Sequence, residues 1–438
     1  MIILTLILTL MAFGMAWLSK RRYGDILAPL GLFSMVWFGM LALETIPIVS
    51  YTPVSAPTWI MLVGAGITFA VGALLVSPPS LNPSRPEGVS AGQGRSHLLG
   101  IALIFAIGLI GTGSFISLVN NLLGWQVVLE DPRLFLYTRR FGDLTKLGVI
   151  GIAYSSNVVL LPLVAMYVTK YRRMPTWLWA VVIYALAVML MDPSRTMLLV
   201  ALSWAVFAWL YMEQKRRAAH TLALAALAVG FGVFFLFSQA RLLKGTFGPQ
   251  NYLYDYSNLR NTPFEGFLDA YIYATGSVPA FDVFVRRVNL DGFTYGFETF
   301  GPVLRLANVI DPRVLYPKSV RDFSLIPFPY NTYTFLDAFY SDFGWLGVLL
   351  GPFLMGLVSQ NLYRNAREKG NFLSVYAASW MASILLSTFN VNRLTWIITW
   401  YYLFIGIVFS LLAAGSRRAV NGRAVSPSPA ASVIRHDI

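Results

Sequence analysis

Basic side chains lie beside apolar stretches at several places in this sequence, and their chemistry suggests a phosphate site. Arg195 opens an apolar run after a Pro-Ser turn, and Arg393 lies between the last two apolar runs. A guanidinium binds phosphate through a bidentate fork and stays charged, so a set of arginines suits a diphosphate. The basic candidates, with one neighbouring tyrosine, are Tyr137, Arg139, Arg140, Arg195, Arg241, Lys244 and Arg393. Contacts with ordinary phospholipid headgroups, or internal pairs with aspartates, are the alternative explanation.

Carboxylates and aromatic side chains share one long segment, residues 241–343. A carboxylate accepts hydrogen bonds from sugar hydroxyls and can act as a general base on an acceptor hydroxyl. Aromatic rings offer an apolar face for a sugar ring. The candidates of these types are Asp269, Tyr271, Glu298, Tyr333 and Asp337. By contrast, Asp311 and Asp342 lie beside turn residues, so we expect structural roles for them.

The cysteine and histidine content of the sequence gives little support for a metal site or for thiol chemistry. The chain has no cysteine, which excludes a disulfide framework and a thiolate metal site. Its three histidines, His97, His220 and His436, are too scattered for a zinc motif. We therefore expect no metal and no cofactor.

The composition indicates the elements that must position these side chains. Of the 438 residues, 57% are hydrophobic and only 12% are charged, whereas soluble domains carry about 25% charged residues. Apolar runs of about 20 residues can cross a bilayer, and in lipid they must be helical. We predict an all-α polytopic membrane protein with about eleven spans. They lie near 2–18, 26–48, 58–76, 98–122, 149–169, 176–191, 197–212, 221–239, 345–362, 373–389 and 396–414.

The basic clusters predict the orientation of these spans. If the spans alternate, five clusters fall on one side of the membrane: 20–22, 170–173, 215–217, 364–369 and 417–423. Lys and Arg accumulate in cytoplasmic loops. The N-terminus is therefore expected outside, in the periplasm, and the C-terminus in the cytoplasm. The net charge of +13 then reflects topology rather than nucleic-acid binding.

The same pattern divides the chain into four parts. Residues 1–240 contain spans one to eight with a medium periplasmic loop at 124–148, and residues 241–343 form a long periplasmic loop with short helices. Residues 344–414 contain spans nine to eleven, and 415–438 form a flexible cytoplasmic tail rich in Ser, Pro and Ala. Long loops in compact proteins are usually functional, so the chemistry is expected on the periplasmic face.

Three stretches carry a resemblance to a known family. They are DPSRTMLLVAL at 192–202, FSQARLLKG at 237–245, and NTYTFLDAFYSDFGWLGVLLGPFLMGL at 331–357. In these stretches and in its architecture the chain resembles the Wzy-type O-antigen, or oligosaccharide repeat unit, polymerases, mainly over 190–415. The resemblance implies a glycosyltransferase of the GT-C class in the bacterial inner membrane.

The resemblance also implies the reaction and the roles of the candidates. A growing glycan on undecaprenyl diphosphate is the donor, and the hydroxyl of another lipid-linked repeat unit attacks it, without a nucleotide sugar or metal. Cations would stabilise the leaving diphosphate. The first choices for this role are Arg195 and Arg241, supported by Arg139, Arg140, Lys244 and Arg393. The expected bases are Asp269 and Glu298, then Asp337. The expected sugar-binding tyrosines are Tyr271 and Tyr333, and Tyr137 is a further substrate-binding candidate. A chain-length regulator is the expected protein partner.

Other functions remain open at this stage. An O-antigen ligase shares the architecture, but that family uses a periplasmic histidine, and all three histidines here are predicted on the cytoplasmic side. A flippase or transporter would be expected to carry ionisable residues within its spans and two related halves, and neither is evident. A non-catalytic scaffold is the third alternative.

Overall fold

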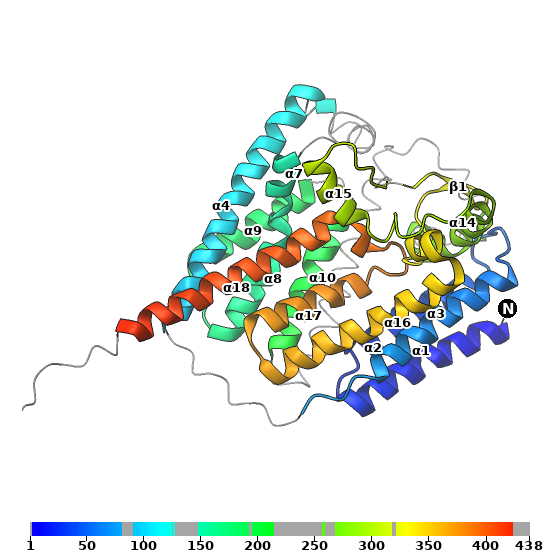
Figure 1. The fold of residues 1–438 in the computed structure, drawn as a ribbon, viewed down its shortest axis with the longest axis horizontal. Helices are drawn as coiled ribbons and strands as arrows, with labels where there is room; N and C mark the ends of the chain where they lie inside the picture. The colour runs from blue at the N-terminus through cyan, green and yellow to red at the C-terminus, as the bar shows by residue number, and fades with distance from the viewer. Residues whose placement is uncertain are drawn as a thin grey trace, which may run out of the picture.

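The computed structural model is a bundle of helices that run side by side (Figure 1). It describes residues 2–80, 91–124, 126–127, 148–191, 195–213, 256–258, 268–317 and 321–423. Within these residues, five stretches of helix are long and apolar enough to cross a membrane: Ile2–Tyr23, Ala56–Leu74, Gln93–Leu122, Ile150–Tyr171 and Asp337–Lys369. Shorter apolar helices lie beside them. This is the architecture of an all-α membrane protein, as the composition predicted.

The helices of the bundle follow one another along the chain as α1 (Ile2–Tyr23), α2 (Pro29–Glu44), α3 (Ala56–Leu74), α4 (Ala91–Leu122), α7 (Gly148–Ser155), α8 (Asn157–Tyr171), α9 (Thr176–Met191), α10 (Arg195–Met212), α16 (Asp337–Lys369), α17 (Phe372–Leu385) and α18 (Ile397–Arg423). The predicted eighth span, 221–239, lies outside the described residues. Each of the other predicted spans coincides with one helix, or with the pair α7 and α8. The predicted start at 345 differs from the start of α16 at Asp337, because that helix contains a break at Gly344.

The described part of the long loop gathers at one end of the bundle, here called the loop end (Figure 1). It contains α13 (Leu268–Thr275), α14 (Ser277–Asp291), α15 (Gly301–Ile310) and a small hairpin of β1 (Ser324–Leu325) and β2 (Pro329–Tyr330). The N-terminal end of α1 lies at the same end (Figure 1). The basic last turns of α1 and α16 lie at the opposite end (Figure 1).

Glycines bring α3 and α16 into close contact. A Cβ atom on Gly72 would lie 2.1 Å from the carbonyl oxygen of Phe353, and one on Gly356 would lie 2.1 Å from that of Phe69. Small residues at helix interfaces allow backbones to approach in this way within membranes. The packing fixes α16, whose N-terminal end carries residues of the candidate site.

Gly356→Ala is expected to destabilise the protein by about 1–3 kcal/mol, because the new methyl group overlaps the backbone of α3. The measurement is thermal unfolding of the purified protein in detergent. Gly39→Ala on α2 is the matched control, since its Cβ would meet no atom within 4 Å. Equal melting temperatures for the two variants would contradict the prediction.

The break in α16 redirects its first residues toward the loop. Gly344 has φ 58° and ψ −138°, a backbone conformation that residues other than glycine rarely adopt. Gly347 completes the break, because its Cβ would lie 2.1 Å from the carbonyl oxygen of Phe339. The segment before the break therefore leaves the helix axis and presents Asp337 and Asp342 to the loop.

Hydrogen bonds tie the loop helices to the bundle. Asp282 of α14 accepts bonds from the amide of Ser55 (3.1 Å) and the hydroxyl of Thr58 (2.7 Å) at the start of α3. Ser277 donates to the carbonyl of Phe389 after α17. These contacts give the loop a fixed position above the bundle.

Candidate functional site

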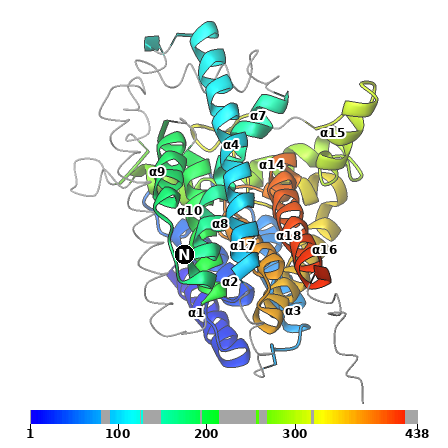
Figure 2. The ribbon, with the colours of Figure 1, turned by 90° about the vertical axis from the view of Figure 1, so that its left-hand side faces the viewer.

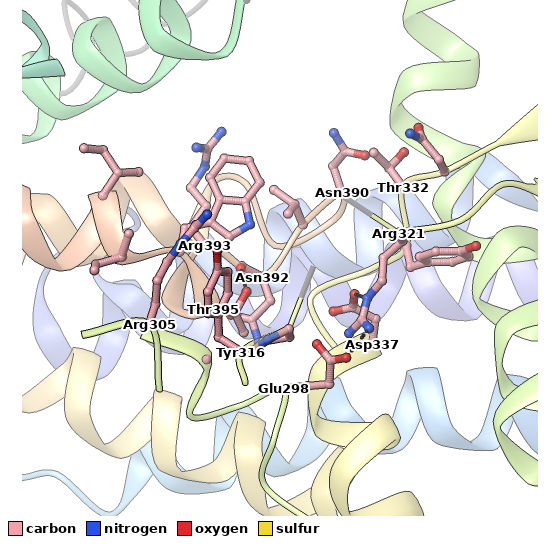
Figure 3. Close-up of a pocket in the computed structure, with 18 of the residues that line it drawn as sticks. Glu298, Arg305, Tyr316, Arg321, Thr332, Asp337, Asn390, Asn392, Arg393 and Thr395 are labelled. Atoms are coloured by element: carbon pink, nitrogen blue, oxygen red, sulfur yellow. Dashed lines mark hydrogen bonds and ion pairs between the residues drawn. The ribbon is translucent and has the colours of Figure 1, made fainter. Parts of the chain in front are cut away.

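A cavity of about 410 Å³ lies at the loop end of the bundle. Its walls come from α15, from the segment before α16, from the start of α16 and from the connection between α17 and α18 (Figure 3). The polar and aromatic residues that line it include Tyr273, Glu298, Arg305, Tyr316, Arg321, Asn331, Thr332, Tyr333, Asp337, Asn390, Asn392, Arg393, Thr395 and Trp396. Segments that are far apart in the sequence thus meet in one polar site.

The first wall, here called the basic wall, contains Arg393 and Arg305. Arg393 begins the short 3-10 helix η3 (Arg393–Thr395) and is 8% exposed. Its Nε donates to the hydroxyl of Ser387 (3.0 Å), and its guanidinium lies 5.2 Å from the ring centre of Trp396. Burial lowers the pKa of Arg393. Among the described residues no carboxylate forms an ion pair with it, so the terminal nitrogens can bind an anion.

Local structure explains why Arg393 points into the cavity. Asn392 caps η3, because its side-chain oxygen accepts from the amide of Leu394 (3.1 Å). The hydroxyl of Thr395 donates back to the Asn392 carbonyl (2.8 Å). The connection between α17 and α18 is therefore a rigid turn rather than an open loop.

Two asparagines beside Arg393 have unused hydrogen-bonding atoms. Asn390 and Asn392 are 5% and 3% exposed. The Oδ1 of Asn390 and the Nδ2 of Asn392 are buried without a partner in the part of the chain that the structure describes. A buried polar atom without a hydrogen bond costs about 1–3 kcal/mol, so such atoms at a cavity indicate a polar ligand.

The second wall, here called the acidic wall, is an ion-pair network around Arg321. The Arg321 NH1 lies 2.7 Å from Oε1 of Glu298, and its Nε lies 3.0 Å from Oδ2 of Asp337. Figure 3 shows Arg321 and Asp337 on one side of the pocket and Arg393 and Arg305 on the other. Burial raises the pKa of Glu298, although the charge of Arg321 opposes this effect. Burial acts to lower the pKa of Arg321, but the negative charges of Asp337 and Glu298 have the larger combined effect. The pKa of Arg321 is therefore raised.

A further aspartate positions the acidic wall. Asp342 is fully buried and accepts hydrogen bonds from the hydroxyl of Thr294 (2.5 Å) and from the amides of Glu298 (3.0 Å) and Thr299 (2.6 Å). It therefore holds the turn that carries the Glu298 side chain. This contact is the structural role that its place beside turn residues suggested.

Asp342→Asn is expected to lower the stability of the protein by about 1–3 kcal/mol, because an amide nitrogen would face a backbone donor. The measurement is the same thermal unfolding assay. Asp311→Asn is the control, because Asp311 is an exposed residue whose partner, Arg313, is also at the surface. A melting temperature for Asp342→Asn equal to that of Asp311→Asn would show that the turn does not depend on this carboxylate.

Comparisons with family models, curated proteins and solved structures found no match. The residues of the cavity are therefore the basis for a proposed function.

The structure places some of the predicted site residues together. Glu298, Tyr333, Asp337 and Arg393 all line the cavity. Tyr333 is almost fully buried, and its hydroxyl donates to the carbonyl of Asp322 (2.7 Å).

Other predicted residues lie elsewhere. The Tyr271 hydroxyl donates to the carbonyls of Leu43 (3.1 Å) and Ile46 (2.6 Å), so it fastens α13 to α2 and is not among the residues that line the cavity. Arg195 begins α10 and Asp269 lies in α13, and the positions of these two side chains are outside what the structure describes. The remaining predicted residues lie outside the described residues: Tyr137, Arg139, Arg140, Arg241 and Lys244.

Sequence reasoning missed several residues of the cavity. Asn390 and Asn392 both come shortly before the predicted residue Arg393, and two asparagines so close to an arginine between apolar runs were a usable signal. Arg321 and Arg305 had no such signal, since each is one of several charges in a long loop. Only the fold shows that Arg321 lies between two carboxylates.

Proposed function

We propose that this chain polymerises oligosaccharide repeat units carried on undecaprenyl diphosphate, and that the cavity is the site of glycosyl transfer. The supporting observation is that one cavity contains Arg393, which has no carboxylate partner among the described residues, and, on the opposite wall, the carboxylates of Glu298 and Asp337. A diphosphate leaving group requires a cation, and an acceptor hydroxyl requires a base.

In the proposed reaction the acceptor hydroxyl oxygen forms a bond to the anomeric carbon of the donor. The bond from that carbon to the diphosphate oxygen breaks, and the electron pair leaves with the lipid diphosphate. Arg393, supported by Arg305, stabilises the negative charge that develops there. The proton of the acceptor hydroxyl passes to a carboxylate of the acidic wall. Asn390 and Asn392 supply hydrogen bonds to sugar hydroxyls.

Glu298 is the favoured base of the two carboxylates. A general base works best when its pKa approaches the working pH, and burial raises the pKa of Glu298 toward that range. Its bond to Arg321 holds it in place. Asp337 would then serve mainly to position Arg321.

The orientation in the membrane is part of the same proposal. The basic ends of α1 and α16 lie opposite the loop end (Figure 1), whose residues line the cavity, and basic residues favour the cytoplasmic side. This supports a periplasmic cavity, a periplasmic N-terminus and a cytoplasmic C-terminus in the inner membrane. We retain about eleven spans and a GT-C type of architecture as proposals.

The direct test is a gel profile of surface and lipid-linked glycans from the source bacterium, with and without this gene. Loss of long chains with persistence of single capped repeats supports the polymerase. Long chains that persist but remain on the carrier lipid would identify a ligase instead. Repeat units that never reach the outer face would identify a flippase.

A further inference from the structure

Helix α15 presents an apolar face that no part of the described chain covers. Val303, Leu306 and Val309 recur every third residue on this ten-residue helix, and each is exposed. Val309 and Ile310 are 78% and 88% exposed. Residues three apart lie on one face of a helix, so these side chains form a single apolar stripe.

The opposite side of α15 faces the cavity. Gly301 and Arg305 line it, and the Arg305 guanidinium lies 4.9 Å from the ring centre of Tyr316. The side-chain nitrogen of Asn308 donates to the carbonyl of Val314 (2.8 Å) and closes the turn after the helix. One helix therefore separates the polar cavity from the apolar stripe.

The neighbours of α15 indicate what lies against this stripe. Helix α15 contacts α18, and Figure 2 shows it at the edge of the bundle near the loop-end parts of α16 and α18. Near the loop end both of these helices expose aromatic or apolar side chains: Trp345 and Leu346 directly after the break in α16, and Trp400 and Phe404 in the first turns of α18. Tryptophans concentrate at the boundary between lipid headgroups and hydrocarbon. The stripe of α15 thus continues the apolar surface that these membrane helices expose.

We infer that α15 is an interfacial helix whose apolar stripe lies in the headgroup and acyl-chain boundary of the leaflet at the loop end. Its amphipathic character and its lack of acidic residues suit this position. The cavity behind it then lies at the edge of the hydrocarbon layer. If the proposed function holds, the substrate of this cavity is an amphiphile whose tail stays in that leaflet.

The absence of cysteine from the chain permits a direct test. Leu306→Cys and Val309→Cys are labelled with a small environment-sensitive fluorophore in vesicles of phosphatidylethanolamine and phosphatidylglycerol. Lipids brominated near the headgroup end of their acyl chains serve as quenchers. Arg313→Cys is the control, because Arg313 follows α15 and its side chain is 90% exposed.

We expect quenching at 306 and 309 to exceed that at 313 by about twofold or more. Equal quenching at all three positions, or none at 306 and 309, would overturn the interfacial placement, including the case in which protein covers the stripe. The readout needs no transfer activity, so it is separate from the test of the proposed function.

A second variant tests whether the interfacial position of α15 serves a lipid-borne substrate. Val309→Asp should reduce polymer made in cells at least severalfold, because an ionised carboxylate is disfavoured at the hydrocarbon boundary. Arg313→Asp should leave it unchanged. Quenching at 309 together with normal polymer from Val309→Asp would show that the helix lies at the interface but does not serve a lipid-borne substrate.

Discussion

Arg393→Ala is expected to reduce glycosyl transfer by about 100- to 1,000-fold, the usual consequence of removing one preorganised charge from a developing anion. Arg393 is buried, lacks a carboxylate partner among the described residues and lines the cavity. Its loss would remove the buried cation that we propose for the diphosphate and would leave Arg305 as the remaining arginine of the basic wall. The measurement is polymer length and amount on gels from cells that express the variant in place of the native gene.

Two variants separate this role from a structural one. Arg313→Ala removes an exposed arginine of the same loop end whose ion pair, within the described residues, is with Asp311, so normal polymer is expected. Arg393→Lys keeps the charge but loses the guanidinium fork, and an intermediate effect is expected. Wild-type polymer from a correctly inserted Arg393→Ala protein would remove Arg393 from the site.

Glu298→Gln is expected to lower the transfer rate by about 100- to 10,000-fold, because the amide cannot accept the acceptor proton. If the proposed function holds, the native protein should also show an acid limb in its pH–rate profile. Burial raises the pKa of Glu298 above its ordinary value of 4.5, so the carboxylate becomes protonated, and activity falls, at a pH above 4.5. The measurement is the initial rate with lipid-linked repeat units in vesicles over a series of pH values.

The residual activity of Glu298→Gln should lack this limb, because the titrating group is gone. Asp311→Asn is the matched control at an exposed carboxylate of the same loop, and it should keep both the rate and the profile. An unchanged acid limb in Glu298→Gln would assign the base to another group, with Asp337 next to be tested by the same design.

The two walls of the cavity also suggest how the site stays in one arrangement before substrate binds. Arg321 forms ion pairs with both Glu298 and Asp337, and Asp342 fixes the turn that carries Glu298. Breaking such a network on one side leaves buried charge without a partner, which costs about 3–5 kcal/mol. The acidic wall is therefore held in place by the protein, while Arg393 and the asparagines keep free atoms for a ligand.

The sequence by itself was sufficient for the class of the protein and for the positions of its helices in the described regions. An apolar run of about 20 residues satisfies its own backbone hydrogen bonds as a helix in lipid, so its structure depends little on the rest of the chain. The same reasoning singled out Arg393, because a charge between two apolar runs is conspicuous.

Only the tertiary structure decided which loop residues form a site. Glu298, Arg321 and Asp337 belong to segments without a periodic pattern, and their contact depends on the break at Gly344 and on the anchoring of the loop to α3 and α17. Tyr271 has the same residue type as Tyr333, yet it fastens α13 to α2 instead of lining the cavity. Residue type predicts what a side chain can do, but its partners depend on contacts between distant segments, which spacing along the chain does not encode.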